Sequence, residues 1–371
     1  MALIYLDNGA TSLHKPPAVA RAVVRAMQTC ANPGRGGYAA AMEAARTVFR
    51  CREKAGEMFS CYPEKVVFTM NCTQGLNIAL GTLIRPGDKV VISGFEHNAV
   101  TRTLHGLGAV TVVAGRKLFD RVDTLGCFEN ALQAGAKAAV FTHVSNVFGY
   151  ILPVEEMAAL CCRYGVPFVV DAAQSAGILP VCLKEWGADF IAMPGHKGLL
   201  GPQGTGLLLC GRTPKPLLYG GTGSMSVDQA MPEDLPERLE PGTLNVPGIA
   251  GLLEGLNHVK RTGLNNIFRR EHGQLLACVR EMEKMGYRVF PGPDQAATVS
   301  FLPRGDCEEA ASLLADQGIA VRAGLHCAPL AHESAGTLET GTVRLGFGLD
   351  ASPRQTEALL QVLSKLRPKL T

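Results

Sequence analysis

Short apolar runs recur along the first part of the chain at the spacing of an α/β protein. Seven of them are rich in β-branched and aliphatic residues and are predicted to be buried strands, at residues 66–69, 89–93, 110–114, 138–145, 167–173, 189–194 and 204–210. Amphipathic stretches such as 73–84 and 153–165 lie between them. The second begins at Pro153 and ends at Gly165, as helices commonly do. Continuous apolar strands that alternate with helices predict a mostly parallel, seven-stranded sheet covered on both faces.

The pattern changes after a segment rich in glycine and proline at 220–248. From there, helical stretches alternate with four short strand candidates, YRVF, AATVSFL, IAVRA and TVRLGF. This mixture predicts a smaller α+β domain. We therefore expect a large domain at 13–256 and a small domain formed by 257–371, to which residues 1–12 return.

Composition and charge narrow the class of protein. The chain has 371 residues, 47% of them hydrophobic and 19% charged, and its net charge of +3 is spread without basic clusters. These values are typical of a globular enzyme and predict no binding to nucleic acid. The N-terminus lacks a basic region ahead of an apolar core, and no uncharged apolar run reaches about 18 residues. We expect neither a secretory signal nor a membrane span, and hence a cytoplasmic protein.

The common metal-binding and nucleotide-binding motifs do not occur in the sequence. C-x-x-C, H-E-x-x-H, G-x-G-x-x-G and the P-loop pattern are all missing, and the nine histidines are dispersed. We therefore expect no metal site and no nicotinamide or P-loop site. The twelve cysteines are scattered through a large chain and are interpreted mostly as reduced, buried thiols.

Two charged residues lie at the ends of predicted strands. Lys197 follows the strand 189–194 within MPGHKGLLGPQGTG, and Asp171 ends the apolar part of VVDAAQS. A lone lysine at a strand end is usually structural, but a buried carboxylate is costly without a partner. A pyridinium nitrogen is one such partner. Pyridoxal 5′-phosphate (PLP) chemistry needs a Schiff-base lysine, an acid on the ring nitrogen, a group stacked on the ring and donors for the phosphate.

Candidates for the remaining requirements occur in the same part of the chain. Cys72 and Thr73 lie at a strand-to-helix junction, where a hydroxyl and free helix N–H groups suit a phosphate, although a plain N-cap explains the spacing equally well. His97 follows the strand 89–93, at the edge where open α/β sheets bind ligands. Taken alone, it would more often be a surface or capping histidine.

Cys327 differs from the other cysteines in its surroundings. It lies in RAGLHCAPLAHESAG, a segment poor in large apolar residues that is predicted to be a loop. Arg322 and His326 lie nearby, and positive charge from them would favour the thiolate, the nucleophilic form of a cysteine. We therefore consider Cys327 a candidate nucleophile.

In combination, these motifs resemble the class V aminotransferase-like PLP enzymes. YLDNGATS, CTQGLNIAL, EHNAV, HVSNVFG, DAAQSAG, GHKGLLGPQGTG, EPGTLN and RAGLHCAP occur in the order of that family, from residue 5 to about residue 348. The chain is most similar to the cysteine desulfurases and selenocysteine lyases that have a short catalytic loop. The resemblance implies PLP-dependent transferase fold type I and a homodimer.

The resemblance also implies a cofactor role for each matching residue. Lys197 would form the Schiff base, Asp171 would pair with the pyridine nitrogen and Gln174 would bond the phenolic oxygen. His97 would stack on the ring and help to move protons, and Asn146 would lie beside the cofactor oxygen. The phosphate would be held by residues of separate segments, Cys72, Thr73, His196 and, from the other subunit, Thr243. The family usually has Ser or Thr three residues before the lysine, where this chain has Pro194, which offers neither a hydroxyl nor an N–H.

The implied substrate site uses other residues. Arg344 would bind the substrate carboxylate as a bidentate donor, with Asn146 and Arg322 beside it. Cys327 would take sulfur from L-cysteine as a persulfide, leaving L-alanine, and pass it to an acceptor thiol or protein. The resemblance thus predicts a cysteine desulfurase.

Three other functions remain open from the sequence. A selenocysteine lyase, which acts on L-selenocysteine, would have the same fold and cofactor. An aminotransferase would give Cys327 no role in the reaction. A non-catalytic sulfur carrier or partner protein would leave Lys197, Asp171 and His97 unexplained.

Overall fold

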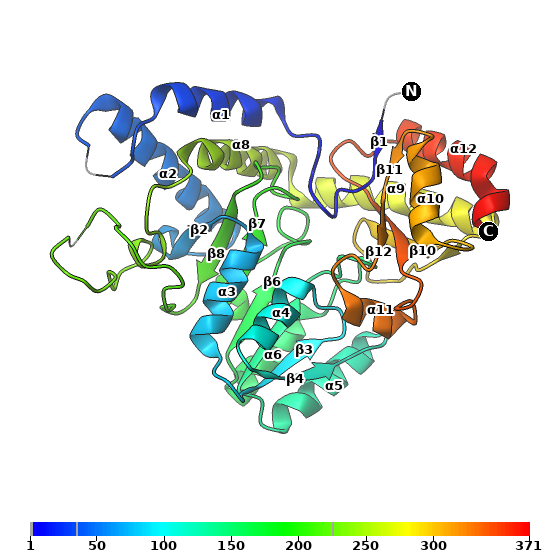
Figure 1. Ribbon diagram of the computed structural model, residues 1–371, viewed down its shortest axis with the longest axis horizontal. Helices are drawn as coiled ribbons and strands as arrows, with labels where there is room; N and C mark the ends of the chain where they lie inside the picture. Colours follow the sequence, from blue (N-terminus) through cyan, green and yellow to red (C-terminus); the bar gives the residue numbers. More distant parts are fainter. Residues whose placement is uncertain (1–2, 35, 225) are drawn as a thin grey trace.

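All seven predicted strands are present in the computed structural model, which describes residues 3–34, 36–224 and 226–371. They are β2 (Val66–Thr69), β3 (Lys89–Ser93), β4 (Val110–Ala114), β5 (Ala138–Thr142), β6 (Phe168–Asp171), β7 (Phe190–Pro194) and β8 (Gly206–Cys210). The strands form one sheet in the order β2-β8-β7-β6-β5-β3-β4. Only β8 runs antiparallel to its neighbours β2 and β7. The mostly parallel seven-stranded sheet is therefore confirmed (Figure 1).

Helices cover both faces of this sheet because alternate strand residues point to opposite sides. Leu207 and Leu209 of β8 belong to one buried cluster, whereas Leu208 belongs to another. The first cluster contains residues of α2 (Ala39–Met58), α5 (Arg121–Gln133), α6 (Val154–Tyr164) and α8 (Val246–Thr262). The second contains residues of α3 (Cys72–Leu83) and α4 (Asn98–Gly106). The helices expected at 73–84 and 153–165 are α3 and α6.

The C-terminal part forms a second core with its own sheet. The strands of this sheet are antiparallel and are ordered β12-β13-β10-β9. The helices and strands of this part are α9 (Leu264–Lys284), β9 (Arg288–Val289), β10 (Thr298–Leu302), α10 (Cys307–Ala315), β11 (Ile319–Ala320), β12 (Arg322–Gly324), α11 (Pro329–Ala335), β13 (Thr342–Gly346) and α12 (Pro353–Leu370). The N-terminal strand β1 (Ile4–Tyr5) pairs in parallel with β11, so the chain start lies beside this core (Figure 1). The domain limits 13–256, 1–12 and 257–371 stay a prediction.

Two details differ from the expected elements. The single strand expected at IAVRA is divided, because β11 pairs with β1 and β12 pairs with β13. The loop expected around Cys327 contains the short helix α11, whose Pro329 at its first position is a common helix start. The remaining helices are α1 (Pro17–Thr29), α7 (Leu183–Trp186) and the short 3₁₀ helices Pro63–Lys65 and Glu237–Leu239. None of the described helices is long and apolar enough to cross a membrane.

Candidate active site at the carboxyl edge of the sheet

One cavity collects polar residues from the ends of several strands. Because β2, β3, β5, β6 and β7 run in one direction, their carboxyl ends meet at the same edge of the sheet. A cavity opens at this edge. Most of the predicted site residues line it, namely Cys72, Thr73, His97, Asn146, Asp171, Gln174, His196 and Lys197. We call it the Lys197 cavity.

Asp171 presents one free carboxylate oxygen in this cavity. The residue is only 3% exposed, and its Oδ1 accepts hydrogen bonds from the Ala173 N–H at 2.8 Å and the Cys72 thiol at 3.4 Å. Among the described residues, none donates to Oδ2. A carboxylate so strongly desolvated needs a further donor or cation, and Oδ2 can receive one.

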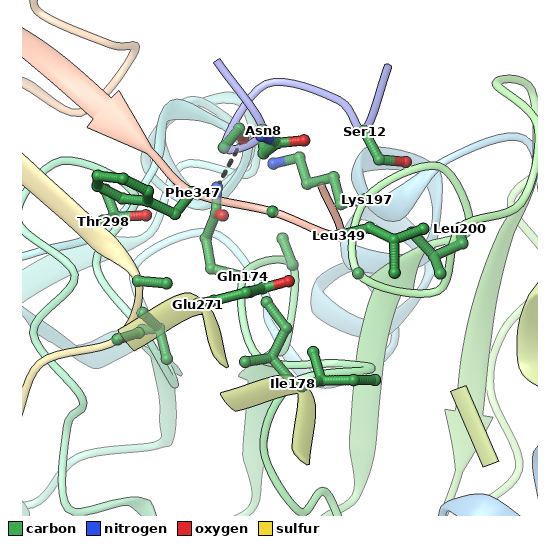
Figure 2. Close-up of a pocket in the computed structure, with 18 residues that line it drawn as sticks. Asn8, Ser12, Gln174, Ile178, Lys197, Leu200, Glu271, Thr298, Phe347 and Leu349 are labelled. Carbon is green, nitrogen blue, oxygen red and sulfur yellow. Dashed lines mark hydrogen bonds between the residues drawn. The ribbon is translucent and has the colours of Figure 1, made fainter. Parts of the chain in front are cut away.

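Lys197 is held in the same cavity by a tight turn after β7. A β-carbon on Gly195 would lie 2.2 Å from Thr205 Oγ1, and one on Gly198 would lie 2.4 Å from the Ala176 carbonyl oxygen, so only glycine fits on either side. Burial lowers the pKa of Lys197, and the charge of Asp171 opposes that shift. Figure 2 shows the side chain extending toward Asn8. A lysine of lowered pKa is more readily available as a neutral amine.

His97 both caps a helix and lines the cavity. It is the N-cap residue of α4, and its Nδ1 accepts a hydrogen bond from the Ala99 N–H at 3.0 Å. Because Nδ1 accepts, the neutral ring carries its proton on Nε2. Burial lowers the pKa of His97, which favours this neutral form. The capping and ligand-site interpretations of His97 are thus compatible.

The start of α3 offers N–H groups to the same cavity. The N-cap is Asn71, whose side chain accepts from the Gln74 N–H at 2.9 Å, and Cys72 and Thr73 are the first two helical residues. N–H groups at these positions have no acceptor within a helix and therefore suit an anion. Pro194, the last residue of β7, lines the cavity without an N–H to add.

Cys327 is exposed on a strained turn that is tied to the cavity. The backbone φ angles of His326 and Cys327 are +51° and +56°, a region that residues with a β-carbon rarely adopt. The Cys327 carbonyl accepts from the Asn98 N–H at 2.7 Å, and the His326 carbonyl accepts from Asn146 Nδ2 at 2.8 Å. Asn98 adjoins His97 and Asn146 lines the cavity, so the turn is anchored beside both.

His326 is neutral and does not supply the positive charge expected next to Cys327. The Arg322 carbonyl can only accept, so His326 Nε2 donates to it over 3.1 Å, and His326 Nδ1 must accept from His332 Nε2 over 3.3 Å. His332 Nδ1 then accepts from the Thr337 hydroxyl at 2.8 Å. Burial and the charge of Arg344 lower the pKa of His326 to about 3. The positive charge expected on His326 is therefore wrong.

The remaining predicted site residues lie outside the Lys197 cavity. Arg344 on β13 is 2% exposed and donates to Asp7 Oδ1 at 2.6 Å and to the Asn146 carbonyl at 2.9 Å. Arg322 is half-exposed and donates to Asp7 Oδ2 at 3.3 Å. Thr243 is exposed and lines a different cavity. None of the three lines the Lys197 cavity, but Arg344 and Arg322 lie close enough that their positive charges help to lower the pKa of Lys197.

A second cavity adjoins the first and was not expected from the sequence. Lys197 and Gln174 line both, and Gln174 Nε2 donates to the Gly9 carbonyl at 2.9 Å (Figure 2). Glu271 of α9 is only 4% exposed there, and none of the described residues donates to its Oε2. Desolvation raises the pKa of Glu271 to about 8, so this carboxyl is protonated at neutral pH. A single acid within an amphipathic helix gives no sequence signal of such burial.

The cysteine thiols and the possible metal ligands were also considered in the sequence, and the structure bears on both. All twelve cysteines are free, and half of them are buried, fewer than the expected majority. In the described part of the chain, no group of three or more His, Cys, Asp or Glu residues could hold a metal ion.

Buried titratable groups predict a stability maximum near pH 6.5. Burial lowers four histidine pKa values to between about 3 and about 4, those of His143, His196, His326 and His332. These histidines bind protons only in the unfolded chain, so stability falls as the pH drops below 6.5. The pKa values of Glu96 and Glu271 are raised to about 8, so these acids hold extra protons in the folded state, and stability falls as the pH rises from 4.5 to 8. Below pH 6.5 the four histidines outnumber the two acids, so the free energy of unfolding rises with pH. Above pH 6.5 the two acids decide the slope, and the free energy of unfolding falls.

Denaturant unfolding at several pH values checks this expectation. Glu271→Gln removes one acid without changing the shape of the side chain. Above pH 6.5 the decline in unfolding free energy should become shallower by about 1.4 kcal/mol per pH unit, the slope of one proton. Glu57→Gln, at an exposed acid, is the control and should keep the parental slope on that side. A parental slope in Glu271→Gln would show that this carboxyl is ionised in the folded protein.

Known proteins are similar in sequence to nearly the whole chain. The model of the family Aminotransferase class-V matches residues 4–359. The chain belongs to the class V aminotransferase family. A probable cysteine desulfurase from Methanothermobacter thermautotrophicus is 32% identical over 382 residues, covering 98% of this chain and 94% of the relative.

Two solved structures have the same fold as this chain. The apo structure of the cysteine desulfurase from Thermococcus onnurineus NA1 superposes with a TM-score of 0.92 at 33% identity, covering 99% of this chain and 95% of that one. A C-DES mutant, with glycine covalently linked to its PLP cofactor, superposes with a TM-score of 0.83 at 21% identity, covering 98% and 96%. The family and the fold implied by the sequence motifs are thereby confirmed.

Proposed function

We propose that this protein is a PLP-dependent cysteine desulfurase that converts L-cysteine to L-alanine and carries the sulfur on Cys327. The single observation that carries the proposal is the position of the Cys327 turn. Its backbone is bonded to Asn98 and Asn146, beside a cavity that already holds Lys197 and Asp171. An aminotransferase has no use for an exposed thiol held there, whereas a desulfurase requires one.

The residues of the Lys197 cavity fit PLP. Asp171 has one carboxylate oxygen bonded within the protein and the other available, as a protonated pyridine nitrogen requires. His97 would cover the ring, and Gln174 and Asn146 would bond its phenolic oxygen. The phosphate would use the N–H groups at the start of α3, the Thr73 hydroxyl and His196, which together replace the donor that Pro194 lacks.

When bound, PLP supplies an electron sink that stabilises negative charge at the substrate Cα. Lys197 would hold the cofactor covalently and, once released by substrate, take the α-proton on Nζ, for which its lowered pKa suits it. Arg344 would orient the substrate carboxylate.

Sulfur transfer balances without an added oxidant. The Cys327 thiolate attacks the substrate sulfur, and an S–S bond forms as the carbon–sulfur bond breaks. The electron pair of the broken bond stays on the β-carbon, which is protonated to give L-alanine. The Cys327 persulfide then passes its sulfur to an acceptor thiol.

A homodimer is part of this proposal. Thr243 is exposed and lines a different cavity from Lys197, and we infer that it reaches the cofactor phosphate of a second subunit. Leu218 lines the same cavity as Thr243 and is half-exposed, and Tyr219 and Val227, which follow it along the chain, are also exposed. Burying them against a second copy would remove their contact with water.

The direct test is turnover of L-cysteine by the PLP-loaded protein. When a reducing thiol is added, alanine and sulfide should appear in equal amounts. When the thiol is omitted, the release of sulfide should be limited by the turnover of the Cys327 persulfide. Parallel assays with L-selenocysteine distinguish a selenocysteine lyase, which would release selenium much faster than it releases sulfur. Alanine formation that depends on an added keto acid would instead indicate an aminotransferase.

A further inference from the structure

Asp7 joins the two arginines assigned to the substrate. Arg344 and Arg322 lie directly opposite each other on the antiparallel strands β13 and β12. Asp7 Oδ1 is 2.6 Å from Arg344 Nη2, and Asp7 Oδ2 is 3.3 Å from Arg322 Nε. Like charges directly opposite on paired strands repel, so one carboxylate shared between them offsets half of their charge.

The N-terminal segment fixes Asp7 in this place. Asp7 forms a bridge with Gly346 at the end of β13, and the preceding strand β1 pairs with β11. Two residues later, a β-carbon on Gly9 would lie 2.9 Å from Arg344 Cζ, so the backbone packs directly on the guanidinium. The backbone that carries Asp7 is therefore held beside Arg344.

Among the described residues, Asp7 is the only acid in contact with either arginine. The charged groups that act most strongly on Arg344 are Asp7 and then Arg322. Asp350 is nearby, but it lies 3.5 Å from His14 and accepts from Gln355 Nε2. The two arginines and the one carboxylate in contact with them therefore carry a single net positive charge.

Arg344 also keeps donors for one carboxylate. Of its five N–H groups, one on Nη2 is used by Asp7 and one on Nη1 by the Asn146 carbonyl. The Nε is buried, and none of the described residues accepts from it. One hydrogen on each Nη and the hydrogen on Nε remain, so donors for a two-bond contact with a carboxylate are still present.

We propose that Asp7 determines substrate specificity by limiting the carboxylate site to one net positive charge. The site then matches an amino acid with one carboxylate and a neutral side chain, and it discriminates against one with a second anionic group. This inference rests on the proposed role of Arg344. It concerns specificity, so it can fail while the desulfurase activity stands.

L-Alanine and L-aspartate test this proposal because they differ by one carboxylate. Both are measured as competitive inhibitors of sulfide release from L-cysteine by the PLP-loaded enzyme, and the quantity of interest is the ratio of the L-aspartate to the L-alanine inhibition constant. Asp7→Asn keeps a side-chain oxygen for Arg344 but removes the charge. The ratio should fall at least about tenfold, since a unit charge a few ångströms away changes anion affinity by that order.

Three variants separate charge from geometry. Asp7→Glu keeps the charge and should keep the parental ratio, even if both inhibitors bind more weakly. Asp350→Asn removes a neighbouring charge that contacts neither arginine and should also keep it. Arg322→Gln, at a half-exposed residue, should raise the ratio, and it tests the proposal if Asp7→Asn does not fold.

The outcomes are distinguishable from those of the proposed function. An unchanged ratio in Asp7→Asn and in Arg322→Gln, with sulfide still released, would overturn the role of Asp7 alone. If the parental protein releases no sulfide, the desulfurase proposal fails. In that case, the dissociation constants of L-aspartate and L-alanine are measured from the visible absorbance of the PLP-loaded proteins. If their ratio is the same in Asp7→Asn as in the parental protein, the role of Asp7 is overturned.

Discussion

Replacing Lys197 by alanine is expected to abolish turnover of L-cysteine, by at least roughly a thousandfold, and to remove the covalent link to the cofactor. The parental protein, loaded with PLP, should be yellow, and borohydride should fix the cofactor to one peptide containing Lys197. The variant keeps Asp171, His97 and the start of α3, so it should still bind PLP through the ring and phosphate. Mass spectrometry of the borohydride-treated proteins measures the link directly.

Lys15 provides a matched control for this experiment. It is a second partly buried lysine, with a pKa lowered by burial to about 8, and its Nζ donates to the carbonyls of Ser12 and His196. Lys15→Ala should lose some stability but keep the covalent cofactor. Attachment of the cofactor to Lys15, or to any lysine other than Lys197, would contradict the assignment.

The strands and the edge that holds the site were predictable because both depend on local patterns. Each strand is a short apolar run between turn residues, so residue type alone identifies it. The rule that parallel strands bind ligands at their carboxyl ends then places His97, Asp171 and Lys197 together without any knowledge of contacts. These three residues do line one cavity.

Other features depend on contacts between distant segments, to which no local pattern corresponds. Asp7 and Arg344 are 337 positions apart, and their pairing requires β1 to return to the C-terminal core. The proton positions on His326 and His332 follow only from the carbonyl and hydroxyl that they meet. The expected positive charge on His326 was also wrong. The sequence around it is poor in large apolar residues, so nothing in it indicates that His326 is buried.

Cys327→Ser is expected to keep cofactor binding and to lose sulfur transfer. Serine retains the β-carbon, so the positive φ at this position and the bonds of the turn to Asn98 and Asn146 are unaffected. No group assigned to PLP changes, and the visible absorbance of the loaded protein should be parental, including its response to added L-cysteine.

Alanine formation from L-cysteine by Cys327→Ser should fall by at least about a thousandfold, because a neutral hydroxyl is a poor nucleophile toward sulfur. Cys162→Ser, at another exposed thiol on α6, is the control and should retain parental turnover. Mass spectrometry after a brief pulse of L-cysteine, without added thiol, should detect one extra sulfur on the Cys327 peptide of the parental protein and none in the variant. If Cys327→Ser forms alanine at the parental rate, the substrate sulfur leaves without an enzyme nucleophile. The exposed thiol would then have no part in the reaction, and the strained turn that holds it would need another explanation.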